Sequence, residues 1–299
     1  MNAKNKNEIQ SKISDTLLRI GAIKKENLEI FSNKTRDNNC LTVFKDRMSK
    51  VIYIDDFYVG EKIYESGSYR NEFNQSSIRD FEDVTDSDRR FNSYKQFIVG
   101  KSIVDFGCGA GSFMKQSRNL AKSLVGVELQ KNFIDALNKE NIKCFKDVNE
   151  IENEQDCIFL FHSLEHLHNP IDLLIKIRNK LKGNEQGKII IEVPHAKDFL
   201  INTLKAQSFI DFTLWSQHLV LHTRESLRLL LEYCGFKGVI IEGVQRYSIS
   251  NHINWLNNNK PGGHKEILSL FETQELVGAY ANALSKIDAN DTLVAIAHT

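Results

Sequence analysis

Apolar and polar residues follow two different patterns along the 299-residue chain. From residue 101 onward, short runs rich in Val and Ile alternate with segments in which apolar residues recur every three or four positions. Such runs are typical of strands buried on both faces, and such segments are typical of amphipathic helices. The predicted strands are 102–106, 123–128, 142–145, 156–161, 188–193, 237–243 and 291–297, and helices are predicted at 112–121, at 131–139, from Pro170 onward and at 225–233.

This alternation of strands and helices predicts an α/β fold for residues 76–299. Nearly continuous apolar strands imply a sheet covered on both faces, and we therefore expect a Rossmann-like, doubly wound domain. A charged helix over 76–99 leads into the domain, and an insertion at 248–290 precedes its last strand.

Residues 1–75 lack this alternation and are expected to form an N-terminal α/β appendage. Apolar residues at helical spacing predict an amphipathic helix from about Asn7 to Phe31. Two β-branched runs, 41–44 and 51–54, flank a polar loop and predict a β-hairpin.

Composition narrows the classes of partner and the compartment. The chain has 39 basic and 39 acidic residues and a formal net charge of +0, so we expect no nucleic-acid partner. Its five cysteines include no C-x-x-C pair, which suits a reducing cytoplasm better than a disulfide framework or a zinc ribbon. No apolar run approaches the roughly 18 residues of a membrane span. We therefore predict a cytoplasmic protein without a membrane span.

A glycine-rich turn follows the first predicted strand of the domain. Gly107, Gly109 and Gly111 allow positive φ and a close approach of a ligand to the backbone. Glu128 ends the next strand, where a carboxylate can accept hydrogen bonds from both hydroxyls of a ribose. Asp105 precedes the turn, where it would repel a pyrophosphate but can hold an ammonium group. S-adenosylmethionine, which has an ammonium and no phosphate, therefore fits better than a dinucleotide.

At this point the sequence resembles the class I S-adenosylmethionine-dependent methyltransferases, in particular the branch that methylates sugars and surface polysaccharides. The resemblance covers about residues 76–247 and the last strand, and it is carried by VDFGCGAGSF, VGVELQKNF, FHSLEHLHNP, IIIEVPH and EYCGFKGVIIE. It implies a seven-stranded sheet with an antiparallel last strand. It also implies that Asp105 and the three glycines line the methionine part of the cofactor, Glu128 the ribose and Asp147 the adenine.

Histidines are the candidate bases, because all nine lie at or beyond position 162. His162 and His195 each follow a predicted strand, and the carboxyl ends of parallel strands form the ligand crevice. The resembling sugar methyltransferases often carry Glu-His-Leu at the position of Gln217-His218-Leu219, and that histidine is a proposed general base. We therefore predict His218, His162 and His195 as catalytic candidates, since imidazole titrates near neutral pH.

The segment from His162 to His166 also fits H-x-x-E-H, a zinc pattern of peptidases in which both histidines lie on one helix. Here the segment directly follows a predicted strand, and the next helix begins only at Pro170. Cys40 stands alone, so the Cys-rich zinc module of the resembling N-terminal segments is missing. We therefore expect no metal.

The acceptor is predicted from the residues around the crevice. Tyr69 and Arg70 lie in the segment that resembles the substrate side of sugar methyltransferases, and His222 precedes a predicted helix. His252 and Trp255 lie in the insertion, where aromatic and polar residues suit a sugar, although a packing or dimerisation role is also open. The N/D-P-P-Y/F pattern used for amino acceptors is absent.

These observations favour a methyltransferase that acts on oxygen or carbon of a sugar. The sugar would be nucleotide-linked or part of a bacterial surface glycan, and a histidine would act as general base. Three alternatives remain open: an O-methyltransferase for another small molecule, a nicotinamide-dependent sugar oxidoreductase, and a catalytically silent subunit that binds S-adenosylmethionine. A homodimer is compatible with the sequence.

Overall fold

A computed structural model describes residues 12–55, 57 and 76–299 of the chain. Its main element is a seven-stranded sheet with the order β10-β11-β8-β7-β4-β5-β6. β11 runs antiparallel to β8 and to β10, and the pairs among β8, β7, β4, β5 and β6 are parallel. The predicted doubly wound sheet with an antiparallel last strand is thereby confirmed. The strands are β4 (Ser102–Phe106), β5 (Ser123–Val127), β6 (Cys144–Phe145), β7 (Cys157–Phe161), β8 (Lys188–Pro194), β10 (Lys237–Val244) and β11 (Thr292–His298).

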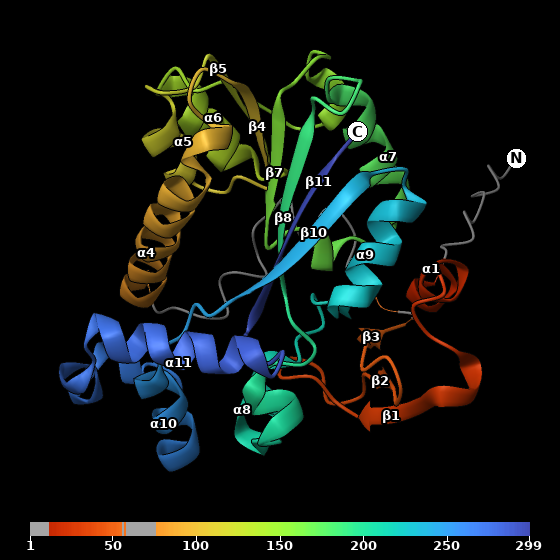
Figure 1. Cartoon of the computed structure of the whole chain (residues 1–299), viewed down its shortest axis with the longest axis vertical. Coiled ribbons are helices and arrows are strands. Elements are labelled where there is room, and N and C mark those ends of the chain that lie inside the picture. Colours follow the sequence, from red (N-terminus) through yellow and green to blue (C-terminus); the bar gives the residue numbers. More distant parts are fainter. Residues whose placement is uncertain (1–11, 56, 58–75) are drawn as a thin grey trace, which may run out of the picture.

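Helices cover both faces of this sheet. Figure 1 shows α4, α5 and α6 on one side and α7 and α9 on the other. Local sequence signals set their ends: Pro170 is the first residue of α7, and the Thr223 hydroxyl accepts from the Ser226 amide at the start of α9. The bounds are α4 (Ser76–Tyr94), α5 (Ser112–Ser117), α6 (Lys131–Lys139), α7 (Pro170–Lys180) and α9 (Arg224–Tyr233).

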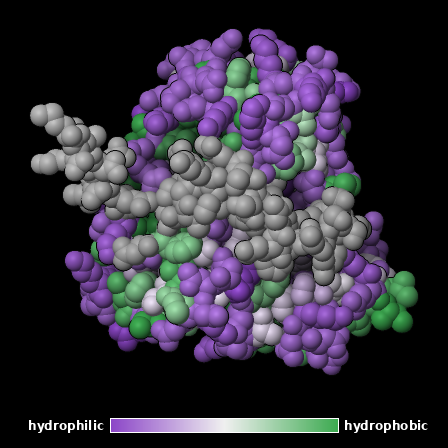
Figure 2. Space-filling model, turned by 180° about the vertical axis from the view of Figure 1, so that it is seen from behind, coloured by the Kyte–Doolittle hydropathy of each residue, from purple (hydrophilic) through white to green (hydrophobic). Residues whose placement is uncertain are grey.

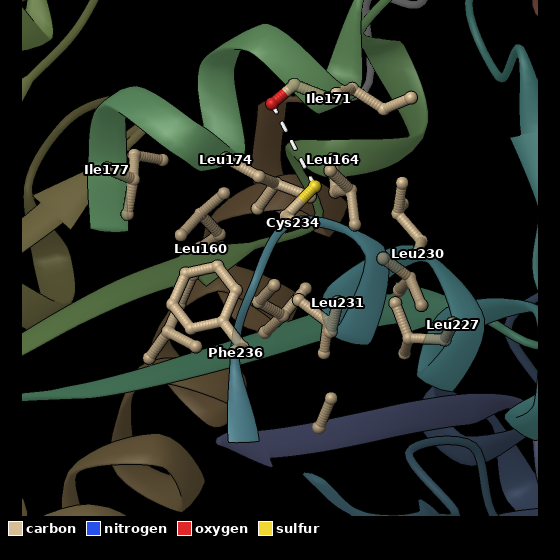
Figure 3. Packing of buried hydrophobic residues seen from close by; sticks show 14 of the residues in the cluster. Leu160, Leu164, Ile171, Leu174, Ile177, Leu227, Leu230, Leu231, Cys234 and Phe236 are labelled. Atoms are coloured by element: carbon tan, nitrogen blue, oxygen red, sulfur yellow. Dashed lines mark hydrogen bonds between the residues drawn. The ribbon is translucent and has the colours of Figure 1, made fainter. Parts of the chain in front are cut away.

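The core lies on both sides of β7 because its alternate residues point in opposite directions. Cys157, Phe159 and Phe161 belong to the cluster on the α4 and α5 side, while Ile158 and Leu160 belong to the other cluster. On that second side, leucines of α7 and α9 interdigitate above the sheet, and the Cys234 thiol approaches the Ile171 carbonyl (Figure 3). Each such buried leucine contributes about 1.5–3 kcal/mol.

A second, antiparallel sheet has four strands, three from the N-terminal part of the chain and one from residues 220–221. Its order is β1-β2-β3-β9, where the strands are β1 (Leu28–Ser32), β2 (Val43–Asp46), β3 (Ile52–Ile54) and β9 (Val220–Leu221). The predicted hairpin is β2–β3, and the Asp46 carboxylate fixes its turn by accepting from the amides of Met48 and Ser49. β9 was not predicted and joins this sheet from far along the chain.

The helix predicted over 7–31 is wrong in its extent. Within the described residues the helix α1 spans only Ile13–Arg19, and residues 28–32 form β1 instead. The helix stops because Gly21 adopts a φ of +74° and the Ala22 amide turns back to the Leu17 carbonyl. The apolar side chains of α1 pack into the same cluster as those of α7 and α9.

The insertion forms helices at the end of the sheet from which β11 starts. α10 (Ile249–Asn258) and α11 (Gln274–Lys286) lie next to α8 (Gln207–Thr213) in Figure 1. Figure 2, seen from behind, shows hydrophobic side chains at its lower right edge, on the side of the molecule where α10 and α11 lie in Figure 1. In the turn between α10 and α11, Ile267 is 80% exposed and Leu270 is 82% exposed. Among the described residues, no helix is long and apolar enough to cross a membrane.

Candidate active site

The turn after β4 requires glycine for its shape. Gly107, Gly109 and Gly111 have φ values of +75°, +54° and +77°. A β-carbon on Gly107 would overlap the Ser163 hydroxyl, and one on Gly111 would lie 2.5 Å from Leu137. Backbone conformation therefore disfavours a side chain at all three positions, and lack of space excludes one at Gly107 and Gly111.

Glu128 closes this turn from the neighbouring strand. Its carboxylate accepts hydrogen bonds from the amides of Gly109, Leu129 and Gln130 at 2.8, 2.8 and 2.9 Å. The side chain is only 7% exposed. A carboxylate held in this way at the end of β5 lies where a ribose in the crevice would be recognised.

Asp105 lies one residue before the end of β4 and is buried. Burial raises the pKa of its carboxyl to about 7; the charge of Arg90 opposes this shift and that of Glu128 adds to it. A buried carboxyl without full compensation favours a positively charged ligand. The ammonium group of the cofactor's methionine part has the charge that this position requires.

Asp147 follows β6 and is exposed. Its carboxylate accepts from the Asn149 amide at 2.8 Å, and its own amide donates to the Glu150 carboxylate at 3.1 Å. The residue therefore caps the 3-10 turn Val148–Glu150. β6 pairs with β5, so Asp147 lies beyond the same end of the sheet as Glu128.

His162 lies at the tip of β7 in an unusual backbone conformation. Its φ is +50°, and its amide donates to the Glu192 carbonyl at 2.9 Å. Its Nδ1 lies 3.2 Å from Glu165 Oε1, and its buried Nε2 has no hydrogen-bond partner among the described residues. Burial, with the charges of Arg246 and Arg90, holds the pKa of His162 well below its ordinary value, so the ring is neutral. Left-handed backbone at a non-glycine residue is concentrated at functional sites.

A cluster of Glu165, His166 and His218 lies beside His162. His166 Nδ1 lies 2.8 Å from the Gln217 carbonyl oxygen, and the rings of His166 and His218 are 5.0 Å apart between centroids. Burial raises the pKa of Glu165 to about 8 and holds that of His218 well below its ordinary value. His162 and His166 do not share a helix, because only Leu164–His166 forms a short 3-10 turn. The peptidase arrangement is therefore absent from this segment.

A buried ion network holds α4 against the same end of the sheet. The Glu192 carboxylate is fully buried and accepts from Arg89 at 2.9 and 3.0 Å, from Arg90 at 2.9 Å and from the Tyr94 hydroxyl at 2.9 Å. Although burial alone would raise it, the pKa of Glu192 is held below its usual value by the two arginines. A charged residue inside the apolar run 189–193 was the signal for this network in the sequence.

His195 and His222 link the two sheets. Their backbones form an isolated bridge, and the Ala196 amide donates to the His222 carbonyl at 2.8 Å. His195 Nδ1 lies 3.0 Å from the Asn290 carbonyl oxygen, and His222 Nδ1 lies 3.1 Å from the Ser226 hydroxyl. Burial lowers the pKa of each ring to about 4. Both rings are therefore neutral and contact neighbouring protein groups.

Comparison with known protein families identifies the chain. The model of a family described as "Methyltransferase domain" matches residues 7–240, about three quarters of the sequence. The chain belongs to this methyltransferase family. Membership makes it an S-adenosylmethionine-dependent enzyme, which confirms the predicted enzyme class and cofactor and removes the oxidoreductase alternative. Among curated proteins, no sequence matches the chain.

Solved structures of other methyltransferases resemble this one. One from Archaeoglobus fulgidus is 20% identical, with 71% of this chain and 92% of that chain covered and a TM-score of 0.49. One from Thermotoga maritima is 14% identical, with 75% and 94% covered and a TM-score of 0.49. A phosphoethanolamine N-methyltransferase of Haemonchus contortus is 18% identical, with 71% and 52% covered and a TM-score of 0.44. The family assignment does not rest on these likenesses.

The predicted acceptor-binding residues of this methyltransferase lie in different surroundings. On α10, His252 Nδ1 lies 2.7 Å from the Tyr280 hydroxyl of α11, and Trp255 packs against Phe209 and Phe212 of α8. Both side chains are buried. Tyr69 and Arg70 lie outside the described residues. The structure thus surrounds the insertion's predicted contacts with protein rather than bringing them to His162.

Proposed function

We propose that this methyltransferase transfers the methyl group of S-adenosylmethionine to an oxygen or carbon atom of a sugar, nucleotide-linked or in a bacterial surface glycan. The observation that carries the proposal is His162: a neutral imidazole at the tip of β7, with Nδ1 beside Glu165 and Nε2 buried without a described partner. Such a ring can take a proton from a hydroxyl or an acidic carbon.

The cofactor is held by the groups around the glycine turn. Asp105 would bind the ammonium, the turn at Gly107 and Gly109 the methionine chain, Glu128 the ribose and Asp147 the adenine. The buried carboxyl of Asp105 and the position of Glu128 at the end of β5 support the first and third of these assignments. They leave the methyl group on the side of the crevice where β7 ends, because Ser163 contacts the Gly107 turn.

Transfer is a displacement at a carbon that the positive sulfur already activates. The acceptor oxygen attacks the methyl carbon, the carbon–sulfur bond breaks, and S-adenosylhomocysteine leaves with the bonding electron pair. The hydroxyl proton passes to His162 Nε2, while the Nδ1 proton faces Glu165. The protein aligns the three reacting centres, which is chiefly a proximity effect.

His162 is preferred as the base over the other two candidates because the next residue, Ser163, contacts the Gly107 turn. His195 Nδ1 lies 3.0 Å from the Asn290 carbonyl oxygen, and its Nε2 lies 4.0 Å from the Asp288 carboxylate. His218 is enclosed by the rings of His166 and Trp215. We propose that these two, with His222, His252 and Trp255, support the segments around the site, and that Tyr69 and Arg70 contact the acceptor.

The sugar is supported by Tyr69 and Arg70, which belong to the segment that resembles the substrate side of sugar methyltransferases, and by the absence of an amine-methylation motif after residue 161. A phenol or another small hydroxyl compound is the second candidate, since His162 would serve it equally well. The lack of a C-x-x-C pair supports a cytoplasmic location. The exposed Ile267 and Leu270 support a homodimer.

The test combines binding and turnover. We expect calorimetry to detect S-adenosylhomocysteine but not NAD, and Glu128→Ala to weaken that binding. With nucleotide sugars as acceptors, His162→Asn should lower kcat by about 10²–10⁴-fold while S-adenosylhomocysteine affinity stays unchanged.

The matched control is His298→Asn at the far end of β11, which should leave kcat unchanged. Unaltered turnover in His162→Asn would move the base to His218 or His195. Methylation of phenols but of no sugar would replace the acceptor class.

A further inference from the structure

Glu165, His166 and His218 form a group of which the mechanism above uses only Glu165, through its contact with His162. Within the part of the chain that the structure describes, this is the one group of three or more His, Cys, Asp or Glu side chains whose ligand atoms all lie within 4.8 Å of one another. Ligand atoms that each lie about 2.1 Å from one tetrahedral ion are about 3.4 Å apart. Binding one cation therefore requires the three atoms to approach one another by up to about 1.4 Å.

Two of the three side chains have a buried polar atom without a hydrogen-bond partner among the described residues. Glu165 Oε2 and His218 Nδ1 are enclosed and have no hydrogen-bond partner within the described residues, and neither does Gln217 Oε1 nearby. An unpaired buried polar atom costs on the order of 1–3 kcal/mol, and buried polar atoms in native proteins are almost always paired. Orphaned acceptors that gather in one place indicate a ligand that accepts their lone pairs.

Each of the two imidazoles is hydrogen-bonded through one ring nitrogen to a backbone carbonyl. His166 Nδ1 faces the Gln217 carbonyl oxygen at 2.8 Å, so a neutral ring carries its lone pair on Nε2. His218 is hydrogen-bonded to the backbone of Thr213, and because its Nδ1 has no partner, this bond uses Nε2 and leaves the lone pair on Nδ1. Metal-binding histidines commonly donate their second N–H to a backbone carbonyl in this manner.

The carboxylate is supported in the same way and lies next to the cofactor turn. His162 Nδ1 lies 3.2 Å from Glu165 Oε1, which leaves Oε2 toward the cluster. The Glu165 carbonyl accepts from the Leu219 amide at 2.8 Å, which joins the segment after β7 to the chain beside His218. Ser163, two residues earlier, contacts the turn at Gly107. The cluster therefore lies beside the place where the methyl group is expected.

We propose that Glu165, His166 and His218 bind one divalent transition-metal cation, with an open position for the hydroxyl of the methyl acceptor. Two imidazoles and one carboxylate are a ligand set of catalytic zinc sites, which keep their fourth position for water or substrate. A hydroxyl bound there loses its proton more readily, and this part of the inference rests on the proposed function. Arg36 adds positive charge near His218, which weakens the binding of a cation there.

The test is a titration with Zn²⁺ after the protein has been stripped with a chelator. Wild-type protein should bind one Zn²⁺ per chain and unfold at a higher temperature when it is bound. Glu165→Gln, His166→Gln and His218→Gln should each weaken binding by about 100-fold or more. The titration contains neither methyl donor nor acceptor, so its result is independent of whether the proposed function is correct.

His298→Gln is the matched control and should bind Zn²⁺ like the wild type. Absence of stoichiometric binding to the wild type, or equal binding by the three variants, would overturn the site. If a variant fails to fold, an anomalous difference map of wild-type crystals with Zn²⁺ decides the matter. A peak between the three side chains supports the proposal, and a peak elsewhere or none overturns it.

Discussion

The glycine turn after β4 and the segment after β7 touch at Gly107 and Ser163, yet the fold completes their hydrogen bonding differently. At the turn, where we propose that the cofactor binds (the cofactor side), the Glu128 carboxylate accepts hydrogen bonds from three backbone amides. On the acceptor side, His162, Glu165 and His218 each keep a buried atom without a described partner. Around the glycine turn, backbone amides already have a hydrogen-bond partner within the protein. Around His162, buried side-chain atoms remain available to bind a ligand.

The largest expected effect tests how far the acceptor side depends on buried charge. Glu192→Gln leaves Arg89 and Arg90 without their carboxylate, and breaking a buried pair on one side costs about 3–5 kcal/mol. Urea unfolding at pH 7 measures this loss. Glu140→Gln, which removes an exposed partner of Lys115, should cost less than about 1 kcal/mol. Equal losses in the two variants would show that the network at Glu192 does not support this end of the sheet.

A middle effect tests the backbone of the cofactor side. Gly107→Ala forces a side chain into a φ of +75° and against Ser163, so we expect S-adenosylhomocysteine to bind about 10–100-fold more weakly. Calorimetric titration measures the change. Gly183→Ala, where a β-carbon meets nothing within 4 Å, should bind normally.

Combining Gly107→Ala with Ser163→Gly removes the overlap but not the strained φ, and should restore part of the affinity. Full affinity in Gly107→Ala itself would contradict the assignment of the turn.

The smallest effect concerns Asp105. Its carboxyl is buried without a full set of compensating charges, which resembles the situation of the unpartnered groups around His162. Burial raises its pKa to about 7, so below that pH the carboxyl is protonated and must ionise to bind an ammonium group. The affinity for S-adenosylhomocysteine should therefore fall about tenfold for each pH unit below about 7 and level off above it. Asp105→Asn should bind weakly and without this dependence, and a flat profile in the wild type would exclude the role.

Much of the larger sheet could be predicted from the sequence because each strand carries its own signal. Buried parallel strands are continuously apolar, and the glycine turn, Pro170 and Thr223 act through local backbone chemistry. The helix α1 was predicted too long because the spacing of apolar residues does not distinguish a helix from a strand that follows it closely. The two-residue strand β9 is too short to show a period.

The candidate site was predictable only in part, for a related reason. The cofactor residues follow consecutive strands, so their order along the chain already places them at one edge of the sheet. Glu165 and His166 lie next to His218 only because two segments about 50 residues apart in the sequence contact each other. The expectation of no metal rested on the helix spacing of His162 and His166 and on the isolated Cys40, and neither observation considers ligands from a distant loop.

The pairing of β3 with β9 has a consequence for the order in which the chain is made. Tyr53 pairs with Val220, so the edge of β3 stays open until about 165 further residues have been synthesised. At about 5–20 residues per second, this takes roughly 8–33 s on the ribosome. During that time the nascent hairpin presents unpaired amides and carbonyls of the kind that recruit other strands. The hairpin is thus completed by a strand that is synthesised much later.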